Sequence, residues 1–210
     1  NYGETKQHPF RFLAHNLKRR FRGWRGYADL METPPPGESY AYFALHYEPE
    51  LATLSMAPFN FDQIALLRQI ARALPFEFKL YVKDHPGMKN RRARTFFKEL
   101  RKLPNVRLID GSQKGMDIIR NSKLVMTITG TAGWEATLLQ KPVITFGKVF
   151  YNDLSFVKRV QNIEVLPEAI REQLYDFHFD EAELVTFVAA SLQDGTPLDY
   201  HQLNYETDVE

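Results

Sequence analysis

The sequence has 210 residues, of which 44% are hydrophobic and 25% are charged, and 27 Lys and Arg residues nearly balance 26 Asp and Glu residues. The net charge of +1 gives no support for a nucleic-acid partner, and the lack of cysteine excludes disulfides and thiolate metal sites, as is usual in the cytoplasm. No apolar run approaches the roughly 18 residues of a membrane-spanning helix, and no signal peptide is visible.

The first 26 residues differ from the rest, because they carry seven basic side chains against one acid, Glu4. Apolar residues recur there at intervals of three and four: Phe10, Leu13, Leu17, Phe21 and Trp24. This spacing predicts an amphipathic helix with a basic face. We expect this helix to pack on the body of the protein or on a neighbouring domain. The alternative is peripheral contact of residues 10–25 with an anionic membrane surface.

Strand and helix patterns alternate after the proline-rich linker ETPPPGES, residues 32–39. Strands are expected at 39–46, 78–86, 105–111, 123–129 and 141–147, and helices at 61–75, 91–104, 115–122, 131–140, 167–177 and 180–193. This order predicts an α/β fold with a doubly wound, Rossmann-like parallel sheet. We place that domain at residues 39–195, after an N-terminal region of residues 1–38 and before a tail of residues 196–210.

The stretch FKLYVKDHPG, residues 78–87, closes a predicted strand on Lys83, His85 and Pro86. Proline cannot donate to a sheet ladder, so the strand is expected to end here, at the sheet edge where doubly wound proteins bind ligands. Two side chains that can bind an anion at one place suggest a phosphate. A solvated lysine beside a turn histidine explains the same residues.

A second stretch, TITGTAGWEAT at residues 127–137, joins a strand to a helix through Gly130 and Gly133. Glycines allow positive φ and close backbone approach, and Thr129 or Thr131 is expected to cap the helix. The free N–H groups of the first helical turn would then bind an anion. Glu135, one turn in, is placed to bind ribose hydroxyls or to act in capping, and Trp134 is a candidate core residue.

In this order and spacing, YFALHYEPE, VKDHP, TITGTAGWEA and KPVITFG resemble the capsule polysaccharide biosynthesis family over residues 39–155. That family includes the bacterial Kdo transferases, which resemble GT-B glycosyltransferases that use CMP-activated sugars. The Lys-x-His-Pro element alone also resembles CDP-glycerol glycerophosphotransferases, sialyltransferases and nucleotide-sugar epimerases. The resemblance implies a bacterial enzyme that makes capsule or another surface polysaccharide.

The resemblance also implies which residues hold the nucleotide sugar: Lys83, His85, Pro86, Gly130, Thr131, Ala132, Gly133, Glu135, His46, Glu48 and Asp110. His85 and the amides of residues 131–133 would contact the CMP phosphate, with Lys83 beside them, and Glu135 would hold the ribose.

The remaining residues of this set surround the sugar and the base. His46 and Glu48 would face the sugar carboxylate or the interdomain cleft, and the cytosine would lie near Ile109 and Asp110. Neither a metal nor another cofactor is expected, since the cationic groups and the helix N-terminus can neutralise the phosphate.

A GT-B enzyme has two such domains, and 210 residues accommodate only the C-terminal, donor-binding half. The chain begins at Asn1 rather than Met, so we expect a piece of a longer transferase. The missing acceptor domain would bind a glycan or glycolipid acceptor, and no catalytic group can be named in this half. The alternatives are an epimerase or glycerophosphotransferase-like domain, and a non-catalytic interaction module whose basic helix docks on a membrane or on assembly partners. The expected location is the cytoplasm, with peripheral contact at the inner face of the bacterial inner membrane as a further option.

Overall fold

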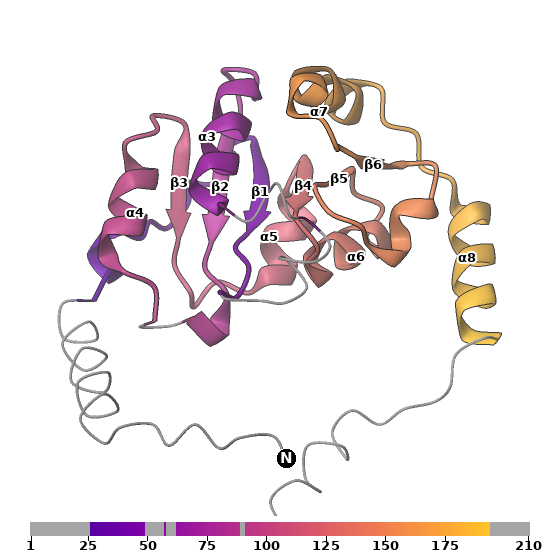
Figure 1. The fold of residues 1–210 in the computed structure, drawn as a ribbon, viewed down its shortest axis with the longest axis horizontal. Coiled ribbons are helices and arrows are strands. Elements are labelled where there is room, and N and C mark those ends of the chain that lie inside the picture. The colour runs from indigo at the N-terminus through magenta and orange to yellow at the C-terminus, as the bar shows by residue number, and fades with distance from the viewer. Residues whose placement is uncertain (1–25, 49–56, 58–61, 89–90, 194–210) are drawn as a thin grey trace, which may run out of the picture. The chain divides into compact units, whose positions relative to one another are not determined.

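The computed structural model describes residues 26–48, 57, 62–88 and 91–193 (Figure 1). The six strands are β1 (Tyr40–Ala44), β2 (Lys79–Lys83), β3 (Val106–Ile109), β4 (Leu124–Thr127), β5 (Val143–Thr145) and β6 (Val157–Arg159). The helices are α3 (Gln63–Ala73), α4 (Arg94–Arg101), α5 (Gly115–Asn121), α6 (Thr131–Leu138), α7 (Leu166–Tyr175) and α8 (Glu181–Gln193). Four single turns of 3₁₀ helix are Ala28–Leu30, Pro86–Met88, Phe150–Asp153 and Ile163–Val165. The predicted N-terminal helix and the tail lie outside the described residues.

All six strands form one parallel sheet in the order β3-β2-β1-β4-β5-β6. The register places Ala44 beside Lys83 and Phe43 beside Met126, so β1 lies between β2 and β4. Parallel strands need crossover connections, and the helices between the strands supply them. The predicted doubly wound, Rossmann-like sheet is confirmed.

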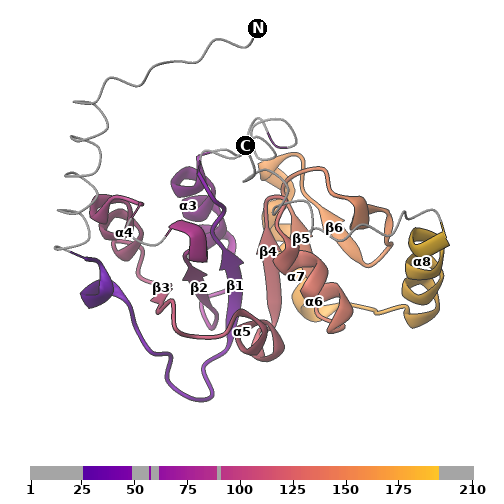
Figure 2. The ribbon, with the colours of Figure 1, turned by 90° about the horizontal axis from the view of Figure 1, so that it is seen from below.

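Helices cover both faces of the sheet, with α3 and α4 on one face and α5 on the other (Figure 2). The first face contains the main hydrophobic core, in which Phe43, Leu80 and Val82 pack with residues of α3, α4 and α7. On the second face, Tyr40 and Tyr81 stack with ring centroids 3.8 Å apart. The Tyr40 hydroxyl donates to the carbonyl of Ile118 in α5 over 2.7 Å. Burial of both strand faces explains the nearly continuous apolar strands of the sequence.

The sequence analysis missed strand β6, which pairs with β5 through Val143 and Val157. This strand has only three residues, and two of them are Lys158 and Arg159. Charged residues are typical of an edge strand, because they prevent pairing with another chain. The same charges remove the apolar pattern from which a strand is predicted.

The proline-rich linker packs on the opposite edge of the sheet. The Glu32 amide donates to the carbonyl of Leu108 over 2.7 Å and so extends the pairing of edge strand β3. Arg107 of β3 forms ion pairs with Glu32 and Glu38 at 2.8 and 2.6 Å, and Tyr81 donates to Glu38. The linker therefore covers the edge that β3 would otherwise expose.

The chain divides into two compact units, with the boundary between Phe177 and His178. The first unit holds the whole sheet, and the described part of the second includes helix α8. The predicted domain, residues 39–195, spans this boundary.

Candidate functional site

The strand order creates a topological switch point between β1 and β4. The chain leaves β1 toward β2 on one side, whereas it leaves β4 toward β5 on the other. In open α/β sheets, ligands bind at the carboxyl ends of the strands at such a point. The stretch 78–87 contains β2 and ends just beyond it, and the stretch 127–137 runs from the last residue of β4 into α6.

The turn after β4 differs from the prediction in two details. Gly130 is the N-cap of α6 with φ of −80°, so no positive φ is needed there, and neither threonine caps the helix by its side chain. The hydroxyl oxygen of Thr127, on the strand itself, accepts the Gly130 amide over 3.0 Å. The amides of Thr131 and Ala132 belong to the first turn of α6, where N–H groups have no partner within the helix.

Close packing explains the two glycines of this turn. A Cβ atom at Gly130 would lie 2.7 Å from the Thr127 hydroxyl, and one at Gly133 would collide with the hydroxyl of Tyr151. The Tyr151 hydroxyl donates to the carbonyl of Gly130 over 2.8 Å, and its ring also contacts Trp134. The sequence analysis missed Tyr151, which lies in the 3₁₀ turn Phe150–Asp153 and holds the N-terminus of α6 through its hydroxyl group.

Lys83 ends strand β2, and only 7% of this residue is exposed. Within the part of the chain that the structure describes, its ammonium group has no carboxylate or hydrogen-bond partner. The stem of Lys83 is buried, but its ammonium group is not among the buried side-chain atoms without a partner, so it reaches solvent at the carboxyl end of the strand and is available to an anionic ligand there.

His85 lies beyond the end of β2 and is exposed, directly before the 3₁₀ turn that starts at Pro86. Its Nδ1 atom accepts the amide of Gly87 over 3.1 Å, so in the neutral ring the proton sits on Nε2. The Tyr47 ring contacts His85 edge-on, with the ring centroids 5.9 Å apart. The opposite ring nitrogen thus remains available as a donor.

Glu135 lies in α6 above the second face of the sheet, and burial raises the pKa of its carboxyl group. The pKa of Tyr42, in β1 below it, is also raised, first by burial and then by the charge of Glu135. A carboxylate in such a place is stabilised by neutral donors such as hydroxyl groups. Asp110 instead accepts the amide of Ser112 over 2.8 Å and so shapes its own turn.

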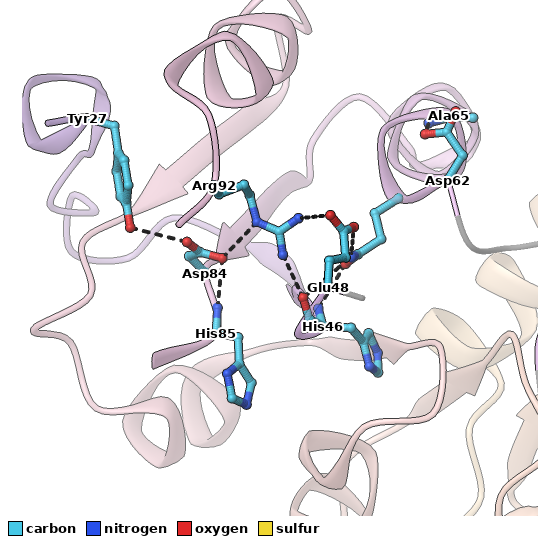
Figure 3. Close-up of polar contacts among 9 residues, drawn as sticks. Tyr27, His46, Glu48, Asp62, Ala65, Asp84, His85 and Arg92 are labelled. Carbon is cyan, nitrogen blue, oxygen red and sulfur yellow. Dashed lines mark hydrogen bonds and ion pairs between the residues drawn. The ribbon is translucent and has the colours of Figure 1, made fainter. Parts of the chain in front are cut away.

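His46 is buried and bridges the switch point. Its Nε2 atom accepts the amide of Ile128 over 3.1 Å and lies 3.1 Å from the Thr127 hydroxyl oxygen. The ring therefore binds the backbone at the end of β4. That His46 faces the sugar carboxylate or the interdomain cleft, as the resemblance implies, stays a prediction. Glu48 is held by Gln63 and by an ion pair with Arg92 at 2.8 Å (Figure 3).

Sequence reasoning also missed Arg92, the buried centre of the contacts in Figure 3. It lies in a basic run, RRAR, and nothing in the pattern separates it from its neighbours in the run.

In the described residues, no group of three or more His, Cys, Asp or Glu side chains is arranged to hold a metal ion. Nor does any described helix have the length and apolarity needed to cross a membrane.

The sheet, its switch point and the first turn of α6 together define a Rossmann-like domain of the type found in GT-B glycosyltransferases and nucleotide-sugar epimerases. The family model of the capsule polysaccharide biosynthesis proteins matches residues 59–188, and the chain belongs to this family. No curated protein matches the sequence.

Two solved structures illustrate the fold. The KpsC β-Kdo 2,7-transferase of Thermosulfurimonas dismutans is 18% identical with a TM-score of 0.51, over 85% of this chain and 64% of its own. The UDP-GlcNAc 2-epimerase of Methanocaldococcus jannaschii is 16% identical with a TM-score of 0.53, over 86% of this chain and 50% of its own. The present chain thus spans between half and two thirds of these proteins.

Proposed function

We propose that this chain is the donor-binding half of a capsule-type glycosyltransferase and that it binds a CMP-activated sugar, with CMP-Kdo as the first candidate. In this proposal Lys83, His85 and the first-turn amides of α6 bind the phosphate, and Glu135 binds the ribose. A second domain would supply the acceptor, a glycan or glycolipid, and the reacting group.

The observation that carries the proposal is Lys83. It is largely buried and unpaired among the described residues, at the carboxyl end of a strand next to β1. A phosphate at the switch point would neutralise this charge, and the N-terminus of α6 and the Nε2 atom of His85 would add hydrogen bonds to the same anion. Membership of the capsule family supports a sugar as the group that the phosphate carries.

A UDP-sugar is the alternative ligand, because the fold of the UDP-GlcNAc 2-epimerase superimposes as well as that of the Kdo transferase. A protein that uses UDP-GlcNAc binds a second phosphate and a different base.

Isothermal titration of the chain with CMP, UMP, UDP and cytidine tests the proposal. We expect CMP to bind more tightly than UMP, and cytidine to bind weakly because it lacks the phosphate. Tighter binding of UDP than of CMP would favour the epimerase-like alternative. A failure of all four ligands to bind would overturn the assignment of a nucleotide site.

A further inference from the structure

Arg92 lies where the loops after β1 and β2 meet, and its side chain is only 3% exposed. Its Nε atom donates to Asp84 over 3.1 Å, and its Nη2 atom donates to the carbonyl of His46 over 2.6 Å (Figure 3). Its Nη1 atom lies 2.8 Å from Glu48, close enough for an ion pair but without the alignment of a hydrogen bond. One guanidinium group thus joins two loops through two hydrogen bonds and one ion pair.

The first arm of this network leads to His85. One carboxylate oxygen of Asp84 accepts both Arg92 Nε and the His85 amide, which lies 2.9 Å away. The other oxygen accepts the hydroxyl of Tyr27 over 3.2 Å. Asp84 is therefore held from two sides, and its orientation sets the backbone from which the His85 ring projects.

The second arm leads to the N-terminus of α6. Arg92 holds the carbonyl of His46, and the ring of the same histidine accepts the amide of Ile128 and contacts Thr127. Thr127 in turn accepts the Gly130 amide. A continuous series of contacts thus runs from Arg92 to the N-cap of α6.

We propose that Arg92 is a positioning residue that fixes both anion-binding elements, the His85 loop and the N-terminal turn of α6, in one relative geometry. Only a planar guanidinium fork offers donors in the three directions that these acceptors require, whereas a lysine keeps the charge but offers a single nitrogen. The role of this geometry in phosphate binding rests on the proposed function; the coupling of the two loops does not.

The coupling can be tested without ligand by amide hydrogen exchange, measured by NMR on the full chain. Arg92→Lys should speed exchange at least five-fold at both the His85 and the Ile128 amides. Arg107→Lys is the matched control, since Arg107 also binds two carboxylates but at the β3 edge, and it should leave both amides within two-fold of the parent protein. Unchanged exchange at either amide in Arg92→Lys, or equal changes in both variants, would overturn the proposal.

Asp84→Asn separates the two arms and serves if Arg92→Lys does not fold. It weakens both hydrogen bonds of the shared Asp84 oxygen, with Arg92 and with the His85 amide, and leaves the His46 arm intact. Exchange should therefore rise at the His85 amide and stay within two-fold at the Ile128 amide. Equal acceleration at both amides would indicate general loosening and contradict two separate arms.

A double-mutant cycle then tests the link to the phosphate. His85→Ala and Arg92→Lys should each weaken CMP binding at least five-fold and leave cytidine binding within two-fold. Adding Arg92→Lys to His85→Ala should cost clearly less than Arg92→Lys alone, because part of its effect passes through the histidine. Fully additive losses would contradict positioning through His85. If the parent chain binds no CMP, the proposed function fails while the exchange result still decides the coupling.

Discussion

In the proposed function, Lys83 contributes to ligand binding rather than to stability. Its stem is buried beside Ala44, and the ammonium group has no partner in the described part of the chain.

Replacing this lysine should therefore separate the two properties. Lys83→Met keeps the apolar stem and removes the charge at the proposed site, so we expect CMP binding to weaken at least ten-fold while the free energy of unfolding changes by less than about 0.5 kcal/mol. Lys79→Met is the control, because Lys79 lies at the N-terminal end of the same strand, away from the proposed site. Urea denaturation and calorimetry measure both effects. A lysine that is only solvated would give no loss of CMP binding.

Glu135 gives a prediction on pH. Because burial raises the pKa of Glu135, the folded protein holds this proton more tightly than the unfolded chain. The stability that this provides is complete below the unfolded pKa of about 4.3 and is lost as the pH rises through the raised pKa of the folded state. Glu135→Gln, which stays neutral, should thus gain stability relative to the parent protein between pH 4 and pH 7.

Urea denaturation at the two pH values measures this difference. Glu168→Gln, at an exposed position of α7, is the control for the loss of one carboxylate. A stability difference for Glu135→Gln that does not grow with pH would show that the carboxyl group is not desolvated in solution.

At the scale of elements, the N-terminal turn of α6 depends on support from three other segments. Tyr151 holds the Gly130 carbonyl from the 3₁₀ turn after β5, Thr127 holds the Gly130 amide from β4, and His46 holds the preceding amide of Ile128 from the loop after β1. Helix propensity contributes little to a helix of eight residues, so these contacts place it.

At Gly133 these contacts leave no room for a side chain. In Gly133→Ala the new methyl group would meet the Tyr151 hydroxyl and the Cγ2 atom of Thr127, so the free energy of unfolding should fall by about 1–3 kcal/mol. Gly115→Ala, in the first turn of α5, has nothing within 4 Å of the new atom and should be neutral or stabilising. Thermal or urea denaturation compares the two variants. Equal effects would mean that α6 does not pack against Tyr151 in this way.

For the molecule as a whole, the proposed function implies binding without turnover. The chain spans 64% of the Kdo transferase and 50% of the epimerase that share its fold. In the proposal, the donor site is formed by this chain and the reacting group by a second domain. Incubation of the 210-residue chain with CMP-Kdo and a capsule-type acceptor should yield no glycosylated product by mass spectrometry, although CMP binds. Product formation would show that the chemistry needs no second domain.

The sequence by itself determined the class of fold, the parallel order of strands and helices, and the two stretches that lie at the carboxyl ends of β2 and β4. These features follow from local patterns: apolar periodicity, a proline after a strand, and glycines between a strand and a helix. The family resemblance added the prediction that the ligand is a nucleotide sugar. Helix ends differed by a few residues, as for α4, expected at 91–104 and observed at Arg94–Arg101.

Only the tertiary structure decided how those stretches are held. Arg92 and Tyr151 act through contacts with residues 46 and 21 positions away in the sequence, and such contacts leave no periodic trace. The same holds for His46, whose ring reaches Ile128 across 82 positions and is thereby buried at the switch point. Local sequence carries backbone preference and burial pattern, whereas a side chain's partner across the sheet is fixed only when the strands take their final order.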